Sequence, residues 1–164
     1  MGYGDILQAS TTTIMFHKIV HLRFLEGVSL ELVFLDGKVV QYDMSNLFNK
    51  YPRLEALRDR KLFLSGKKYS YGIRWNDELD IDGETIYQEG KTIRVEELPI
   101  NLTIAYSVLS ARNKSGLSQT QLSKLTGIDQ ADISKIESGR SNPSIVTLKR
   151  IADALGIKLR ILLQ

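Results

Sequence analysis

The sequence has no cysteine and only 3 prolines and 1 tryptophan among its 164 residues. Without cysteine it can form no disulfide framework, no thiol nucleophile and no cysteine-based zinc or iron–sulfur site. No uninterrupted apolar run reaches the roughly 18 residues that a membrane span requires. Residues 1–16 contain no basic stretch followed by a long apolar segment, which argues against a secretory signal. We therefore expect a cytoplasmic protein that makes no membrane contact.

Familiar catalytic motifs are also missing, because the sequence has no glycine-rich phosphate loop, no GxSxG and no HExxH. The acidic run from Asp77 to Glu84 lacks the later ligands and the bidentate glutamate of a calcium loop. His17 and His21 would share a face only on a helix, whereas the apolar run at residues 19–25 predicts a strand. We therefore expect neither an enzyme nor a metal site, and no cofactor.

Basic and acidic residues are unevenly distributed along the chain. Residues 1–99 hold 13 Lys+Arg and 15 Asp+Glu, whereas residues 100–164 hold 9 basic and 4 acidic side chains. The last third is therefore a basic unit in a chain whose formal net charge is +3. A basic surface attracts polyanions through counterion release, although many basic domains bind no nucleic acid.

The first half of the chain has the pattern of a small antiparallel sheet. Two apolar runs, Ile19–Leu25 and Ser29–Leu35, are followed by Asp36-Gly37 and a third run, Lys38–Asp43. An Asp-Gly pair between two such runs is a strong hairpin signal. Further elements are predicted as short helical pieces at 44–48 and from Pro52, and as strands at 62–64, 69–75 and 78–81. The pattern predicts a small α+β domain over residues 17–90.

The second half has the pattern of short helices. Four are predicted, from about Leu102 to Asn113, Ser118 to Leu125, Asp129 to Gly139 and Ile145 to Gly156. Ser118 and Gln121 have the spacing of a capping box at the start of the second helix. Gly127 provides the following turn, and Asp129 is the expected cap of the third helix. The tail at 157–163 fits either a strand or a docking arm.

Two short helices joined by a three- to four-residue turn with glycine form a helix-turn-helix, whose second helix enters the DNA major groove. Leu122, Ile133 and Ile136 face the predicted core of this pair. Four polar or small side chains are left on the outward face of the second helix: Gln130, Ala131, Ser134 and Lys135. Glutamine can pair with adenine, lysine can donate to guanine, and alanine can contact a thymine methyl group.

Several segments match one family pattern: Arg112-Asn-Lys-Ser-Gly-Leu-Ser-Gln119, Gly127-Ile128, Ile133-Ser-Lys-Ile-Glu-Ser-Gly139 and Ile151-Ala-Asp-Ala-Leu-Gly156. On these residues, 102–157 resemble the Cro/repressor type of helix-turn-helix, the XRE family with a lambda-repressor-like fold. The resemblance implies binding to double-stranded DNA. The family pattern also has five helices, so a fifth would have to come from the tail.

The resemblance implies a role for particular residues. Gln130, Ala131, Ser134 and Lys135 would face bases, whereas Gln119, Thr120, Ser138 and Arg140 would contact phosphates. Arg112 of the first helix would pair with Glu137 of the third, and we interpret this ion pair as structural. Asp132 lies in the first turn of the third helix, where it suits the helix dipole but would repel a nearby phosphate.

The first half also resembles a family, through Leu32-Val-Phe-Leu-Asp-Gly37, Leu54-Glu-Ala-Leu-Arg-Asp59, Gly72-Ile-Arg-Trp-Asn-Asp77, Leu79-Asp-Ile81 and Glu84-Thr-Ile-Tyr87. Residues 17–90 are similar to DUF2442, a small bacterial family that implies no activity. The expected organisation is therefore a flexible N-terminus at 1–16, an α+β domain at 17–90, a linker at 91–100 and a helix-turn-helix domain at 101–164.

These patterns predict a sequence-specific DNA-binding transcriptional regulator, a repressor that binds a pseudo-palindrome as a homodimer. The N-terminal domain would supply dimerisation, a small-molecule effector pocket or a surface for a partner protein, and the sequence leaves these open. An alternative is an antitoxin-like autorepressor whose N-terminal domain binds a partner protein. A plain four-helix bundle and a protein-binding module without DNA are two further interpretations.

Overall fold

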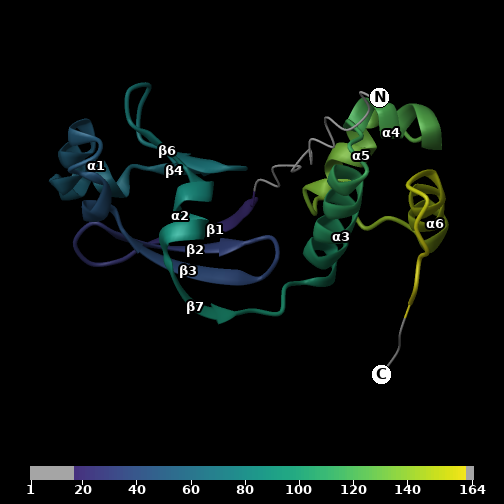
Figure 1. Cartoon of the computed structure of the whole chain (residues 1–164), viewed down its shortest axis with the longest axis horizontal. Coiled ribbons are helices and arrows are strands. Elements are labelled where there is room, and N and C mark those ends of the chain that lie inside the picture. Colours follow the sequence, from purple (N-terminus) through teal and green to yellow (C-terminus); the bar gives the residue numbers. More distant parts are fainter. Residues whose placement is uncertain (1–16, 162–164) are drawn as a thin grey trace, which may run out of the picture.

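The computed structural model describes residues 17–161, which form a sheet-containing part followed by a group of helices (Figure 1). We call residues 17–95 the sheet region and residues 100–161 the helical region. Residues 1–16, the predicted flexible N-terminus, and residues 162–164 lie outside the described residues. Among the helices of the described residues, none combines the length and the apolar character needed to cross a membrane.

The main sheet has four strands in the order β1-β2-β3-β7, and every neighbouring pair is antiparallel. The strands are β1 (Ile19–Phe24), β2 (Ser29–Phe34), β3 (Lys38–Asp43) and β7 (Lys91–Val95). The β2–β3 turn has the geometry that Asp-Gly predicts. Asp36 Oδ1 accepts a hydrogen bond from the Lys38 backbone N–H at 3.0 Å, and Gly37 has a φ of 87°, which favours glycine. The predicted antiparallel sheet is confirmed.

A second sheet and four short helices complete the sheet region. The second sheet contains β4 (Lys67–Tyr69), β5 (Gly72–Arg74) and β6 (Asp80–Asp82) in that order. The helices are η1 (Met44–Leu47), η2 (Pro52–Arg58), α1 (Arg60–Leu64) and α2 (Gly83–Glu89). Their shared core includes Phe34, Phe63 and Ile86, and the indole Nε1 of Trp75 donates to the Phe63 carbonyl oxygen at 2.8 Å.

Three predictions for this part of the chain are wrong or incomplete. Residues 62–64 lie in helix α1, because the Asp59 side chain caps that helix by accepting from the Leu62 N–H at 2.9 Å. The predicted strand at 69–75 is two strands, β4 and β5, separated by a turn at residues 70–71. The predicted linker at 91–100 is shorter in the structure, since Lys91–Val95 form β7 and pair with β3, and α3 begins at Ile100.

The helical region contains α3 (Ile100–Lys114), α4 (Gln119–Thr126), α5 (Gln130–Glu137) and α6 (Ile145–Ala154). Val108, Leu122, Ile133, Ile136 and Ile151 form its core. Asp129 is the N-cap residue of α5 as predicted, but its carboxylate makes no capping hydrogen bond to that helix. Residues 157–161 form neither helix nor strand, so the described part of the tail provides no fifth helix.

A third apolar cluster joins the two regions. Leu35, which follows β2, is 4% exposed and packs with Ala105 and Leu109 of α3. Val20 of β1 packs against the same cluster from the sheet side. The main sheet therefore lies beside α3, the helix on which the helix-turn-helix packs (Figure 1).

Candidate nucleic-acid interface

Helices α4 and α5 form a helix-turn-helix whose start and turn are determined by local sequence. Ser118 Oγ accepts from the Gln121 backbone N–H at 3.1 Å, and Gln121 Oε1 accepts from the Ser118 N–H at 2.8 Å. This capping box satisfies two of the backbone donors at the start of α4. Gly127 ends α4 with a φ of 68°, a left-handed conformation that glycine adopts without strain. The chain then enters α5 within three residues.

The outward face of α5 has the four residues predicted to face bases. Gln130, Ala131 and Lys135 are exposed, and Ser134 is half-buried. Lys135 Nζ forms an ion pair with Asp132 Oδ1 at 2.7 Å, and the two side chains are 53% and 55% exposed. Such exposed pairs contribute only about 0–1 kcal/mol, so this ion pair holds the Lys135 side chain only weakly. Asp132 therefore lies against a cation of its own helix.

Behind this face, Arg112 of α3 and Glu137 of α5 form a buried ion pair. Arg112 Nε donates to Glu137 Oε1 at 2.5 Å and Nη2 donates to Oε2 at 2.8 Å, while Nη1 donates to the Leu117 carbonyl at 2.6 Å. The two side chains are only 11% and 3% exposed. The hydrogen bonds to Glu137 raise the pKa of Arg112 although its burial opposes this. The pair fixes α3 against α5 and the start of α4.

Gln119, predicted only as a phosphate contact, connects this ion pair to the outward face. Its Nε2 donates to Glu137 Oε2 at 2.9 Å, and its Oε1 accepts from Gln130 Nε2 at 2.9 Å. The structure therefore brings Arg112, Glu137, Gln119 and Gln130 into one hydrogen-bonded chain. Sequence reasoning missed this link because it depends on the distance between α4 and α5, which no local pattern gives.

The other predicted phosphate contacts lie at two places. Thr120 is exposed in the first turn of α4, where the helix dipole favours an anion. Ser138 and Arg140 lie just after α5, where Arg140 Nε donates to Ser138 Oγ at 2.8 Å. Ser138 is half-buried and Arg140 is exposed. Both places border the outward face of α5.

Comparisons with known proteins agree with this arrangement. A helix-turn-helix family model matches residues 108–162, and the model of a protein family of unknown function, DUF2442, matches residues 19–92. An uncharacterized HTH-type transcriptional regulator of Haemophilus influenzae is 31% identical over 90 residues, which are 55% of this chain and 85% of that protein. The chain belongs to the helix-turn-helix transcriptional regulators.

Two further matches are more limited. An uncharacterized HTH-type transcriptional regulator of Sinorhizobium fredii is 39% identical over 46 residues, which are 28% of this regulator and 60% of that protein. A crystal structure of the protein NE0471 from Nitrosomonas europaea aligns with 83% of this chain and 84% of its own, at 16% identity and a TM-score of 0.39.

The sheet region of the regulator reaches the end of α5. Lys18 Nζ donates to the Glu137 backbone carbonyl at 3.1 Å, across 119 residues of sequence. Tyr71, in the turn between β4 and β5, is close enough to the buried ion pair to be affected by it. Its pKa is raised by burial and by the Glu137 carboxylate, against the opposing effect of Arg112. Lys18 and Tyr71 of the sheet region therefore lie close to the ion pair between α3 and α5.

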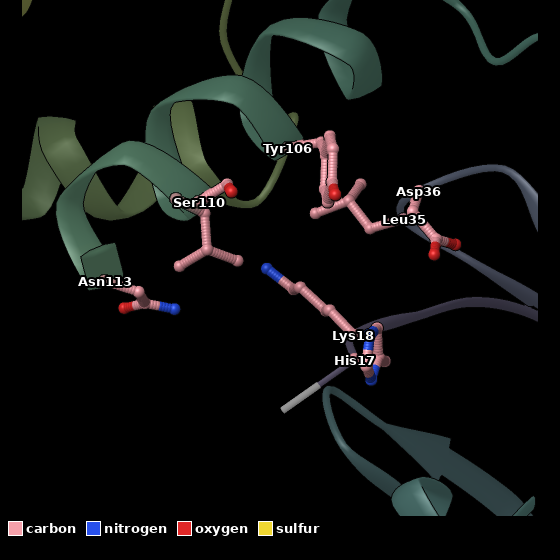
Figure 2. Close-up of a pocket in the computed structure, with 8 residues that line it drawn as sticks. His17, Lys18, Leu35, Asp36, Tyr106, Ser110 and Asn113 are labelled. Atoms are coloured by element: carbon pink, nitrogen blue, oxygen red, sulfur yellow. The ribbon is translucent and has the colours of Figure 1, made fainter. Parts of the chain in front are cut away.

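A small cavity lies between the two regions, lined by His17, Lys18, Leu35 and Asp36 on the sheet side and by Tyr106, Leu109, Ser110 and Asn113 on α3. Figure 2 shows the Lys18 side chain extending from the sheet side towards α3. The volume of this cavity is about 20 Å³, which is enough for a water molecule.

Of the two histidines weighed as metal ligands, His17 precedes β1 and His21 lies on it. His17 Nδ1 is 2.9 Å from Glu84 Oε2, and its ring stacks on Tyr87 with centroids 3.4 Å apart. Hydrogen bonds from Gln88 and His17 outweigh the effect of burial and lower the pKa of Glu84. Among residues 17–161, no three His, Asp or Glu side chains gather in a way that could hold a metal ion.

Proposed function

We propose that this regulator binds a specific DNA sequence by inserting α5 into the major groove, and that Gln130, Ala131, Ser134 and Lys135 contact base edges there. The observation that supports this most strongly is the hydrogen-bonded chain from the buried ion pair to Gln130. It gives Gln130 a hydrogen-bond partner, Gln119, that is itself bonded to the buried ion pair. The function is binding and not catalysis.

The hydrogen bonds through Gln119 also support an assignment of the atoms that Gln130 offers to a base. The Glu137 carboxylate only accepts hydrogen bonds, so Gln119 turns its amide nitrogen to Glu137 and its oxygen to Gln130. Gln130 then donates one N–H to Gln119, and within residues 17–161 its other N–H and its Oε1 have no hydrogen-bond partner. These are the donor and the acceptor that bidentate pairing with adenine N7 and N6 requires. We therefore propose adenine as the base that Gln130 reads.

We further propose that Thr120, Arg140, Ser138 and the outer edge of Gln119 bind phosphates. The exposed positions of Thr120 and Arg140 beside α5 support this assignment. Phosphate contacts fix the register of the protein on the duplex, whereas base contacts determine the sequence. The Arg112–Glu137 pair is proposed as structural, since its atoms are nearly inaccessible to DNA.

We propose that the protein acts as a homodimer that represses transcription in the cytoplasm. Helix-turn-helix dimers bind two half-sites whose centres lie about 10 base pairs, or a multiple, apart. Exposed apolar side chains on α4 and α6 support a self-contact: Leu125, Ile145 and Val146 are 60%, 61% and 70% exposed. We also propose that the sheet region and the helical region are separate domains, which their distinct apolar cores support.

The test is a selection from random duplex DNA with the purified full-length protein at about 150 mM salt, followed by binding measurements on any enriched sequence. We expect a palindrome that is bound at least about a thousandfold more tightly than random DNA, as is typical of specific regulators. The half-site spacing should be about 10 base pairs or a multiple. No enrichment by folded protein would contradict the proposal.

The antitoxin-like alternative uses the same DNA contacts and adds a partner protein on the sheet region. Both forms of the proposal therefore predict the same operator. They differ in whether a protein encoded beside this chain co-purifies with it and changes operator affinity. A stable complex of the two would favour the antitoxin-like autorepressor.

A further inference from the structure

A groove lies between the sheet region and the loop that follows α5, and its polar lining is basic. Lys18, His21 and Lys68 line it from the sheet region, and Ser138 and Arg140 line it from the helical region. No carboxylate side chain of residues 17–161 is among the lining residues. This contrasts with the rest of the sheet-forming part, because residues 1–99 together hold more acidic than basic side chains.

The cations of this groove lie close enough to influence one another. Burial lowers the pKa of Lys18, and the charges of Arg140 and Lys68 lower it further, against the opposing effect of Glu137. The Glu137 carboxylate is already held by Arg112 and Gln119. Within the described residues, no acidic side chain forms an ion pair with Lys68 or Arg140. Like charges gathered without partners repel one another, so the groove favours an anionic ligand.

The position of the groove indicates which anion. Ser138 and Arg140, the proposed phosphate contacts after α5, form one of its walls. Lys68 lies on β4, and in Figure 1 the β4–β6 end of the sheet region lies on the same side of the molecule as α4 and α5. A DNA strand held by Ser138 and Arg140 would therefore pass beside Lys68 as it leaves the half-site.

We propose that the sheet region is part of the DNA interface, with Lys68 binding a backbone phosphate in the flank of the half-site. Lys18 is a positioning residue, because its Nζ is held by the Glu137 carbonyl and joins the end of α5 to β1. The inference rests on the proposed DNA-binding function and adds a second phosphate-binding element to it. Such a contact carries no sequence information and extends the footprint beyond the bases that α5 reads.

The test compares two single substitutions in the full-length protein, Lys68→Gln and Lys67→Gln. The two lysines are neighbours on β4 and both are exposed, but only Lys68 lines the groove. Binding is measured between 50 and 200 mM salt on a duplex cut at the edge of the half-sites and on one with about ten extra base pairs on each side. Random-sequence duplexes of the same two lengths are included, since phosphate contacts do not require the operator.

On the long duplexes, Lys68→Gln should lower the magnitude of the salt slope by about one unit per chain. The advantage of the wild type over this variant should therefore shrink about threefold per chain across that salt range. Lys67→Gln should keep the wild-type slope, and the cut duplexes should not distinguish the two variants. Melting temperatures should be unchanged, because both side chains are exposed.

Two outcomes would overturn the inference, and they differ from failure of the proposed function. A wild-type slope for Lys68→Gln on every duplex would remove the sheet region from the interface while leaving operator binding intact. A second outcome is a wild-type salt slope for Lys68→Gln together with a stabilising effect of inorganic phosphate. If phosphate raises the melting temperature of the wild type and of Lys67→Gln but not of Lys68→Gln, the ligand is a small anion. Wild-type protein that binds none of the duplexes would overturn both proposals.

Discussion

At the scale of single residues, Lys135 and Arg140 both carry an exposed charge but occupy different positions. Lys135 is on the outward face of α5, where Asp132 is its only ion-pair partner among the described residues. Arg140 lies beyond the end of the helix and hydrogen-bonds Ser138. The first position is suited to a base edge and the second to a phosphate, so their loss should have different effects on sequence discrimination.

We expect Lys135→Ala to weaken binding to the operator by about 1–3 kcal/mol while binding to random DNA changes little, because a base contact is lost. By contrast, Arg140→Ala should weaken binding to both DNAs alike and reduce the salt slope, because a phosphate contact is lost. Titrations of each variant against operator and random duplexes check both expectations. Equal losses on the two DNAs for Lys135→Ala would exclude it from base recognition.

At the scale of elements, the start of α4 depends on one serine. Ser118 Oγ accepts a hydrogen bond from the Gln121 backbone N–H, and the Ser118 backbone N–H donates to Gln121 Oε1. Ser118→Ala removes the side-chain acceptor, so the free energy of unfolding should fall by about 1 kcal/mol. Urea denaturation of the full-length protein measures this change. Ser107→Ala is a suitable control, because Ser107 is exposed within α3 and its hydroxyl donates to the Thr103 carbonyl of the same helix. This substitution should leave the denaturation midpoint nearly unchanged.

Elements with strong local signals were predictable, and those made by distant contacts were not. The capping box at Ser118 and the left-handed Gly127 depend on neighbours in sequence, and both are found as predicted. Strand β7 was missed because it exists through pairing with β3, fifty residues earlier. Its approach needs Gly90, where a Cβ atom would come within 2.2 Å of Val40 Cγ1. No pattern near residue 90 reports the position of Val40.

The same distinction applies to the candidate site. The outward face of α5 follows from helical periodicity, which is local, and the family resemblance supplied the Arg112–Glu137 pair. The bond between Gln119 and Gln130 and the contact of Lys18 with Glu137 both join separate elements. Both contacts depend on how the helices and the sheet pack together, which no local sequence pattern gives. Asp129 shows the converse, since a typical capping residue at the start of α5 makes no side-chain cap.

At the scale of the whole molecule, a small apolar cluster and the hydrogen bond of Lys18 to Glu137 connect the sheet and helical regions. Leu35 is 4% exposed against Ala105 and Leu109, and Lys18 bonds to the end of α5. If the proposed phosphate contact of Lys68 is correct, this contact surface must hold the sheet region in place while DNA is bound. Its stability is then part of DNA recognition and not only of folding.

We therefore expect the intact protein to unfold in a single thermal transition that Leu35→Ala divides into two. Removing a buried leucine side chain costs about 2–5 kcal/mol, and here the loss falls on the contact between the regions and not on either separate core. Calorimetry of the full-length variant measures the division. Leu64→Ala is the matched control, because Leu64 is 48% exposed and should leave one transition. If Leu35→Ala still unfolds in one step at a lower temperature, the two cores are coupled by more than this cluster, and the prediction is wrong.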